Sequence, residues 1–280
     1  MERAPSSSYQ PQDLDLDLKS LWFAKSPVTL PPSIVGTGKD KKIYASSSGW
    51  SSSGARKTHT YNTVVQDNKT LARTKINLTW DASNPSVTVK AKQKHIPPPR
   101  KLDQRELEAY RQNYSDAVAT WCESNMGRQV GDGECWTLAN EGLKAVATNC
   151  NSYGTEPCMP SQSYIHGSLI YTFIPASSSY PEPQGGVFEA GVARGDVVQV
   201  YKGIFKSKDG RRSQFAGDPD HTAVVTSVET NGVLRVVESN VGGSKNVREG
   251  SYNMEELVKG EVRIFRAVGV NWLGKLDPSW

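Results

Sequence analysis

The sequence predicts an α+β fold in which a small β-rich N-terminal segment precedes a helical region and an antiparallel sheet. Three observations support this prediction. Extended patterns dominate the first third of the chain, two amphipathic helix patterns follow, and four strand patterns occupy most of the remainder. A chain of 280 residues is long enough for one large domain or two small ones with a sizeable core.

The N-terminal region divides into a polar tail and a β-rich segment. Residues 1–20 are polar and rich in proline and serine, and we expect them to be disordered. Residues 21–96 form the β-rich segment, in which the stretches 71–80 and 86–95 carry strand patterns. The second of these places lysines on the face opposite its apolar residues. The serine-rich stretch SSSGWSSSG, residues 46–54, is expected to form a mobile loop.

A proline spacer at residues 97–101 is expected to separate this segment from a second domain, residues 102–280. This domain opens with a strong helix pattern. Asp103 is followed three residues later by Glu106, which is the spacing of a capping box. The apolar residues at helical spacing, which we expect to face the core, are Leu107, Tyr110, Tyr114, Ala117 and Trp121.

A second helix is expected to begin at about Cys135, directly after the glycine-rich stretch GDGE. The four strand patterns that follow this helix lie at residues 195–201, 221–229, 233–240 and 260–268. Because one or two helices precede these successive strands, we predict that the strands form a meandering antiparallel sheet.

Charge is unevenly distributed along the chain. Residues 1–101 carry 16 Lys and Arg against 7 Asp and Glu, a net charge of +9, whereas residues 102–280 carry 17 against 22, a net charge of −5. A basic region of this kind can bind an acidic protein, lipid headgroups or nucleic acid. No nucleic-acid-binding motif accompanies it, and a solvated surface is the simpler interpretation.

The sequence also indicates a compartment and excludes several kinds of site. It has no apolar run long enough to span a membrane and no signal-peptide pattern, so we expect a cytoplasmic protein with four free thiols. Cys150, Cys158 and His166 do not have the spacing of a zinc site. No phosphate-binding or dinucleotide-binding motif is present, so no metal or cofactor is expected.

Cys135 is the residue best placed for thiolate chemistry. A free thiol has a pKa of about 8.5 and is only a few per cent ionised at neutral pH, but a helix N-terminus stabilises the anion. Gly131 and Gly133 let the backbone bend before the helix and let a substrate approach closely. Gln129 lies six residues before Cys135, and we expect its amide and the Cys135 backbone N–H to stabilise an oxyanion.

His221 opens a predicted strand and is the best candidate for a base. If the Asn-Gly pair of the following hairpin forms a two-residue type I′ turn, Thr230 pairs with Val233 and the numbers of paired residues add up to 463. Glu238 and Asn240 then share a face with His221, and Asn240 is the nearer neighbour. A base and an orienting polar group on one face form the second half of a Cys–His–Asn/Glu arrangement.

The blocks GDGECWTLA, GDVVQVY, HTAVV and VVESN resemble the Cys, His and Glu-x-Asn blocks of CHAP and NlpC/P60 papain-like peptidases and amidases. The resemblance covers about residues 127–268 and implies a papain-like cysteine-proteinase fold. It also implies that Cys135 is the nucleophile, His221 the base, and Glu238 or Asn240 the group that orients the base.

A longer resemblance covers the chain from about Leu21 onward. LWFAKSP, INLTWDASNPSVTVKAKQKHIPPPRKL and VGDGECWTLANEGL are similar to the C-terminal cysteine-proteinase-fold domain of fungal myosin tail region-interacting proteins of cortical actin patches. This resemblance implies an intracellular protein linked to endocytic actin assembly, with actin-patch components as partners or substrates. The SH3 domain and long proline-rich region of the longer members are missing from this sequence, so binding to class I myosin through an SH3 domain is not implied.

Two functions follow from the sequence. In the first, the chain is a cysteine hydrolase that acts on an amide or isopeptide bond of a cytosolic protein. In the second, it is a catalytically silent adaptor of the endocytic actin machinery, whose fold and basic N-terminal segment present a binding surface.

Overall fold

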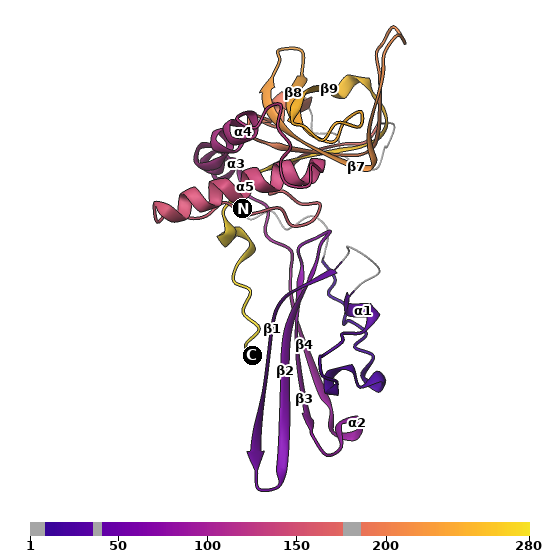
Figure 1. Ribbon diagram of the computed structural model, residues 1–280, viewed down its shortest axis with the longest axis vertical. Helices are drawn as coiled ribbons and strands as arrows, with labels where there is room; N and C mark the ends of the chain where they lie inside the picture. The colour runs from indigo at the N-terminus through magenta and orange to yellow at the C-terminus, as the bar shows by residue number, and fades with distance from the viewer. Residues whose placement is uncertain (1–8, 36–40, 176–185) are drawn as a thin grey trace, which may run out of the picture. The chain divides into compact units, whose positions relative to one another are not determined.

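The computed structural model describes three stretches of the chain, which are residues 9–35, 41–175 and 186–280 (Figure 1). The chain divides into two compact units. Unit 1 comprises Met1–Arg100 together with Leu273–Trp280, and unit 2 comprises Lys101–Trp272. The first boundary falls within the expected proline spacer.

Unit 1 contains an antiparallel sheet whose strands follow chain order: β1 (Lys41–Ser53), β2 (Arg56–Asp67), β3 (Arg73–Asp81) and β4 (Lys90–Ile96). Residues 46–54 were expected to form a loop, but most of them lie in β1. Its serines pair residue by residue with β2, because ladder hydrogen bonds use only the backbone. The strand expected at 86–95 begins only at Lys90, because a short helical turn, α2 (Pro85–Thr88), precedes it.

The described part of the N-terminal region, residues 9–35, packs on one face of this sheet. It contains three short helical turns, η1 (Leu18–Ser20), η2 (Trp22–Ala24) and α1 (Pro32–Val35). The buried residues of the shared core are Leu16, Trp22, Phe23, Ile34, Tyr61, Val65, Ile76, Leu78 and Trp80. Disorder was expected for residues 1–20. Residues 9–20 instead lie against the sheet, because Leu16 and its neighbours supply apolar side chains to this core. Residues 1–8 lie outside the described residues.

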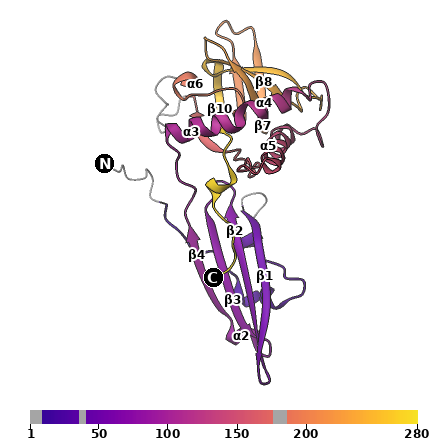
Figure 2. The ribbon, with the colours of Figure 1, turned by 90° about the vertical axis from the view of Figure 1, so that its left-hand side faces the viewer.

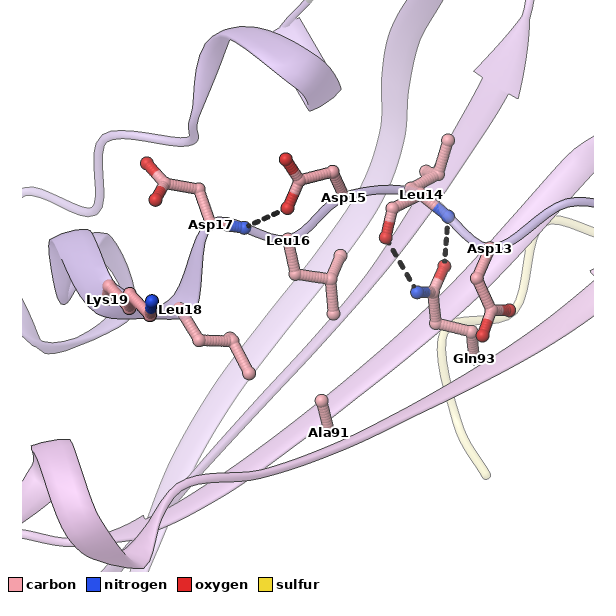
Figure 3. A pocket seen from close by; sticks show the side chains of 9 residues that line it. All are labelled: Asp13, Leu14, Asp15, Leu16, Asp17, Leu18, Lys19, Ala91 and Gln93. Atoms are coloured by element: carbon pink, nitrogen blue, oxygen red, sulfur yellow. Dashed lines mark hydrogen bonds between the residues drawn. The ribbon is translucent and has the colours of Figure 1, made fainter.

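The alternating stretch DLDLDL, residues 13–18, is held by strand β4 (Figure 3). The Gln93 side chain donates a hydrogen bond to the Leu14 carbonyl (2.9 Å) and accepts one from the Leu14 N–H (3.0 Å). The amide of Gln93 therefore binds the backbone of Leu14 as a neighbouring strand would. His95, two residues along β4, lies 2.8 Å from the carboxylate of Asp13.

We predict that Gln93→Ala lowers the free energy of unfolding of unit 1 by about 1–2 kcal/mol, because two hydrogen bonds to one backbone are lost. Chemical denaturation measures this change, and hydrogen exchange at the Leu14 amide should become faster. Lys92→Ala is the matched control, since adjacent residues of a strand point to opposite faces. Equal exchange rates at Leu14 in the two variants would contradict the prediction.

The C-terminal segment Leu273–Trp280 was expected in the second domain, but it belongs to unit 1. Side chains of β3 bind its backbone. Arg73 donates hydrogen bonds to three consecutive carbonyls, those of residues 273–275, and Lys75 donates one to the carbonyl of Ser279. Buried Arg73, which also donates to the Gln66 side chain on β2, therefore finds three acceptors in a segment about 200 residues away along the chain.

Unit 2 opens with a long helical stretch. It runs from α3 (Gln104–Tyr110) through a π-helical turn (Arg111–Ser115) into α4 (Asp116–Glu123). The predicted capping box is confirmed, since the Asp103 carboxylate accepts from the Glu106 N–H (2.8 Å) and the Glu106 carboxylate accepts from the Asp103 N–H (3.0 Å).

The π-helical turn was not predicted, and it changes which residues face the core. A π turn adds one residue and so rotates the following helix about its axis. Ala117 was expected to be buried but is exposed, whereas Val118, Ala119 and Cys122 are buried. Of the predicted stripe, Tyr110, Tyr114 and Trp121 pack in or against the core and Leu107 is half-buried, so the prediction is wrong only for Ala117.

The sheet of unit 2 is antiparallel, as predicted, and has the strand order β5-β10-β6-β7-β8-β9. Its strands are β5 (Ser168–Phe173), β6 (Val197–Lys206), β7 (Ser213–Val228), β8 (Val233–Glu238), β9 (Arg248–Asn253) and β10 (Leu257–Arg266). Strands β5 and β9 were not predicted. The remaining elements are α5 (Cys135–Ser152), α6 (Gly186–Glu189), η4 (Met254–Glu256) and η5 (Val270–Leu273).

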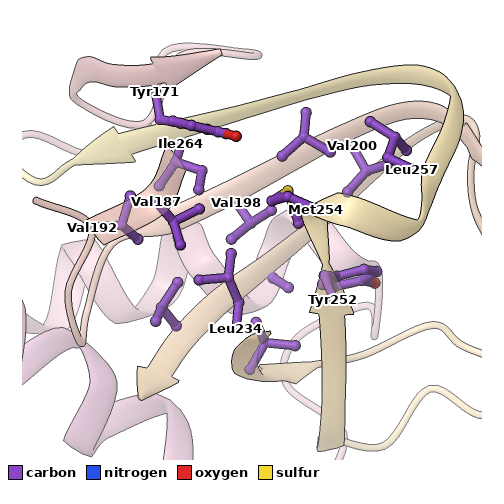
Figure 4. Close-up of a cluster of buried hydrophobic side chains, with 14 of the residues drawn as sticks. Tyr171, Val187, Val192, Val198, Val200, Leu234, Tyr252, Met254, Leu257 and Ile264 are labelled. Atoms are coloured by element: carbon purple, nitrogen blue, oxygen red, sulfur yellow. The ribbon is translucent and has the colours of Figure 1, made fainter. Parts of the chain in front are cut away.

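Alternation along the central strands produces two cores. Val197 and Val224 pack on one face of the sheet with α4 and α5, which lie along that face in Figure 2. Val198 and Ala223 point to the other face, where they join the apolar cluster of Figure 4. Among the described residues, no helix is long and apolar enough to cross a membrane.

Candidate active site

Cys135 is the first residue of α5 and follows a tightly held loop. The Asp132 carboxylate accepts a hydrogen bond from the Glu134 N–H at 3.1 Å. Gly133 has a φ of +78°, and a Cβ atom there would lie 2.5 Å from the Cβ of Lys245. Glycine is therefore required at this position, and the loop delivers the cysteine to the N-terminus of a helix of 18 residues.

The thiol of Cys135 is partly buried, and its pKa is lowered. Burial is the largest single influence on this pKa and acts to raise it. The hydrogen bond and charge of His221 act in the opposite direction, together with the backbone N–H groups of Thr222 and Trp136, and their sum outweighs burial. The arrangement therefore favours a thiolate.

His221 lies between this thiol and a buried carboxylate. Its Nε2 atom is 2.9 Å from Oε2 of Glu238, which leaves Nδ1 for the hydrogen bond with Cys135. Burial acts to lower the pKa of His221, but the hydrogen bonds to Cys135 and Glu238 outweigh it and raise the pKa to about 9. The ring is therefore positively charged at neutral pH, beside a sulfur atom that favours negative charge.

Glu238 is only 2 % exposed and is held by a second donor. The hydroxyl of Tyr252, on strand β9, donates a hydrogen bond to its Oε2 at 2.6 Å. Burial acts to raise the pKa of Glu238, but the hydrogen bonds from His221 and Tyr252 outweigh it and lower the pKa. Glu238 can therefore remain an anion that orients the imidazolium.

The turn between β7 and β8 differs from the two-residue type I′ turn that we expected. The Glu229 N–H donates to the Val233 carbonyl at 2.9 Å, so three residues, 230–232, form the loop. Gly232 has a φ of +80°, which is typical of the last position of a three-residue hairpin loop. This turn moves the register by one residue relative to the prediction.

A bulge moves the register by one residue more. It lies between Val225 and Ser227, and beyond it Ala223 pairs with Glu238, so the numbers of paired residues add up to 461. A shift of one residue would have turned Glu238 away from His221, whereas a shift of two keeps both on one face. The expected face is thus correct, although the expected turn was wrong.

Asn240 and Gln129 do not hold the positions expected of them. Asn240 follows the end of β8 with a φ of +59°, and its side-chain amide donates to Oε2 of Glu134 at 2.6 Å. The side-chain amide of Gln129 donates to the carbonyl of Gly131 at 3.1 Å. Both residues therefore fasten the loop that precedes Cys135, and the carboxylate that bonds His221 is Glu238.

A family model described as the AIM3/BBC1 cysteine proteinase-fold domain matches residues 92–277. The chain belongs to this family. The predicted fold class and the resemblance to a fungal cysteine-proteinase-fold family are thereby confirmed. Within this AIM3/BBC1 domain, the described residues contain no group of three or more His, Cys, Asp or Glu side chains that could hold a metal ion.

Two curated relatives are similar to this AIM3/BBC1 chain. "Altered inheritance of mitochondria protein 3" of Debaryomyces hansenii is 31% identical over 280 residues, which cover 98% of this chain and 28% of that protein. "SH3 domain-containing protein C23A1.17" of Schizosaccharomyces pombe is 25% identical over 209 residues, which cover 72% and 12% respectively. The chain therefore spans less than a third of the length of the curated relatives it matches.

A solved structure, "The crystal structure of Ly7917", aligns with 54% of this chain and 62% of its own. The sequence identity is 16% and the TM-score is 0.29. This likeness is too weak to support any inference about the AIM3/BBC1 domain.

Sequence reasoning missed two residues of the site in this AIM3/BBC1 domain, Tyr252 and Gly250. Both lie on β9, which carries no alternating apolar pattern that could have revealed a strand. A Cβ atom on Gly250 would overlap Oε1 of Glu238, so the carboxylate occupies the space that a side chain would fill. The Gly-x-Tyr spacing of 250–252 is the one signal in the sequence, because residues two apart share a face of a strand.

We predict that Gly250→Ala slows alkylation of Cys135 by iodoacetamide at pH 6 about fivefold, because a displaced Glu238 holds His221 less firmly. Mass spectrometry at several times gives the rate for each cysteine. Gly49→Ala is the matched control, since Gly49 also lies in a strand and a Cβ atom there meets nothing within 4 Å. An unchanged rate in Gly250→Ala would show that the carboxylate tolerates displacement.

Proposed function

We propose that this domain is a papain-like cysteine hydrolase that cleaves an amide or isopeptide bond of a protein. The observation that carries the proposal is the position of buried His221, hydrogen-bonded to both Cys135 and Glu238. A histidine held in this way lowers the pKa of the thiol and can later donate its own proton.

The proposed reaction uses the groups of this site in sequence. The Sγ atom of Cys135 attacks the carbonyl carbon, and the Cys135 backbone N–H, at a helix position without an intrahelical acceptor, stabilises the oxyanion. His221 gives its proton to the leaving amine as the carbon–nitrogen bond breaks and a thioester forms. His221 then accepts a proton from water, which attacks the thioester and releases the carboxylate and the thiol.

The test is covalent labelling of the native chain with a peptide vinyl sulfone, together with release of amine from fluorogenic peptide amides. We expect one adduct on Cys135 and none in Cys135→Ala, and we expect amine release to disappear in the same variant. Cys150 is an internal control, since it is a free cysteine that is partly buried as Cys135 is. Unlabelled Cys135 in a native chain whose other thiols still react would overturn the proposal.

We propose an adaptor role as the second candidate function. The basic N-terminal region supports it, as does the similarity to a Schizosaccharomyces pombe protein that is named as SH3 domain-containing. In this role the protein acts in the cytoplasm at cortical actin patches, as the sequence resemblance implies.

A cell that carries Cys135→Ala in place of the native residue separates the two functions. If the Cys135→Ala cell assembles patches normally and the variant co-localises with an actin-patch marker, the adaptor is favoured. If that cell has the same phenotype as a cell that lacks the whole protein, the hydrolase is favoured.

A further inference from the structure

His166 is a titratable residue that the proposed reaction does not use, although it is completely buried. Its Nδ1 atom lies 2.8 Å from the Ser161 hydroxyl, and its Nε2 atom lies 2.9 Å from Oε1 of Gln199. Because Oε1 can only accept, the hydrogen of the ring is assigned to Nε2. Burial lowers the pKa of His166 to about 4, against the opposing effect of the Gln199 hydrogen bond, so the ring is neutral at physiological pH.

Gln199, on β6, connects this buried histidine to the strand that carries His221. Its Oε1 atom also accepts a hydrogen bond from the Thr222 hydroxyl at 2.9 Å, and its amide nitrogen donates to Oδ1 of Asp220 at 3.4 Å. One side chain therefore holds both sequence neighbours of His221. The backbone N–H of Thr222 is also one of the groups that bond the Cys135 thiol.

From this geometry we infer that Gln199, anchored by His166, is a positioning residue that sets where His221 meets Cys135. The inference rests on the proposed function and deepens it. Glu238 and Tyr252 hold the ring of His221 from β8 and β9. Gln199, on β6, holds the side chains of the two residues that flank His221. A buried, neutral His166 has a fixed hydrogen-bonding pattern at physiological pH, so the amide of Gln199 is held in one orientation.

The test is the rate of alkylation of Cys135 by iodoacetamide as a function of pH, in the full chain and without any substrate. The Cys135–His221 pair is surrounded by three further charged or titratable groups, which are Glu238, Tyr252 and Arg248. We expect Gln199→Met to slow alkylation about tenfold at pH 6 and to leave it unchanged at pH 9.5, because less of the thiol is ionised. We expect Thr222→Val, which removes one of the two contacts, to slow alkylation about threefold at pH 6.

Tyr114→Phe is the matched control for a merely structural effect. Tyr114 is buried, and its hydroxyl donates to the carbonyl of Glu156 at 2.9 Å, a hydrogen bond that does not involve the chain from Asp220 to Thr222. All three variants should lower the melting temperature. Only Gln199→Met and Thr222→Val should move the pH profile of alkylation and the NMR titration of His221.

Each outcome decides the inference. A native pH profile in Gln199→Met, together with a lowered melting temperature, would overturn it and leave the proposed function intact. An ordinary thiol profile in the unsubstituted chain would overturn both. If Gln199→Met does not fold, Thr222→Val decides, and a native profile in that variant would overturn the inference.

Discussion

Replacing His221 by alanine is expected to slow alkylation of Cys135 at pH 6 about 100-fold, because a thiol of ordinary pKa is less than 1 % ionised at that pH. Burial is the largest influence on the pKa of Cys135 and acts to raise it, and the contributions of His221 oppose that effect. Without the imidazole, the N–H groups of Thr222 and Trp136 remain as the opposing influences. The loss should shrink as the pH rises through and above the ordinary pKa of a thiol, because more of the thiol is then ionised without the imidazole.

The direction of the pH dependence follows from the two shifts. The pKa of Cys135 is lowered and that of His221 is raised to about 9, so the thiolate–imidazolium pair exists between them. Hydrolysis should fall as pH drops through the pKa of Cys135, and should fall again above about 9, where His221 has lost the proton that the leaving amine needs. His95→Ala is the control, since His95 belongs to unit 1. A His221→Ala chain with the native profile would rule out the pair.

Replacing Arg266 by methionine is expected to lower the free energy of unfolding of unit 2 by about 3–5 kcal/mol, because it leaves a buried carboxylate without its partner. The Arg266 guanidinium binds Asp196 through two hydrogen bonds, Nε to Oδ1 at 2.9 Å and Nη2 to Oδ2 at 2.7 Å. It also donates to the carbonyl of Gly191 at 2.7 Å. Both side chains of the pair are at most 4 % exposed, so water cannot replace these bonds.

Chemical denaturation monitored within unit 2 measures the effect of Arg266→Met. Lys208→Met is the control, since it also removes the cation of an ion pair. Lys208 pairs with Glu255, and the two side chains are 79% and 63% exposed. We expect no detectable change from that control, because exposed pairs contribute little. If the two variants proved equally stable, the buried pair would contribute no more than a surface pair.

The sequence predicted the start of the helix that carries Cys135 and the order of the candidate site residues, because both depend on short-range signals. Glycines before Cys135 and the helix pattern after it indicate the same boundary, and the structure has α5 begin at Cys135. The partner of His221 could not be chosen from the sequence. That choice depended on a turn and a bulge, each of which moves a strand by one residue, and neither has a strong local signature.

Unit 1 was harder to predict because one of its strands has no apolar pattern and because its core joins residues that are distant in the sequence. The serine-rich half of β1 offers no apolar face, yet its backbone pairs with β2. The aspartates of residues 13–18 make this stretch polar on average, although the leucines between them pack against the sheet. A pattern that is read within one short window cannot include a neighbour that lies about 80 residues away, as Gln93 does from Leu14.

The attachment of Leu273–Trp280 to Arg73 has a consequence for biosynthesis. A ribosome makes β1 to β4 early, but the carbonyls that accept the hydrogen bonds of Arg73 are made only after all of unit 2. Until then Arg73 has Gln66 as an acceptor within unit 1, and its remaining hydrogen bonds form only when residues 273–275 are present. A chain that ends near residue 272 would lack these acceptors of Arg73, and we expect the sheet of unit 1 to be less stable in it.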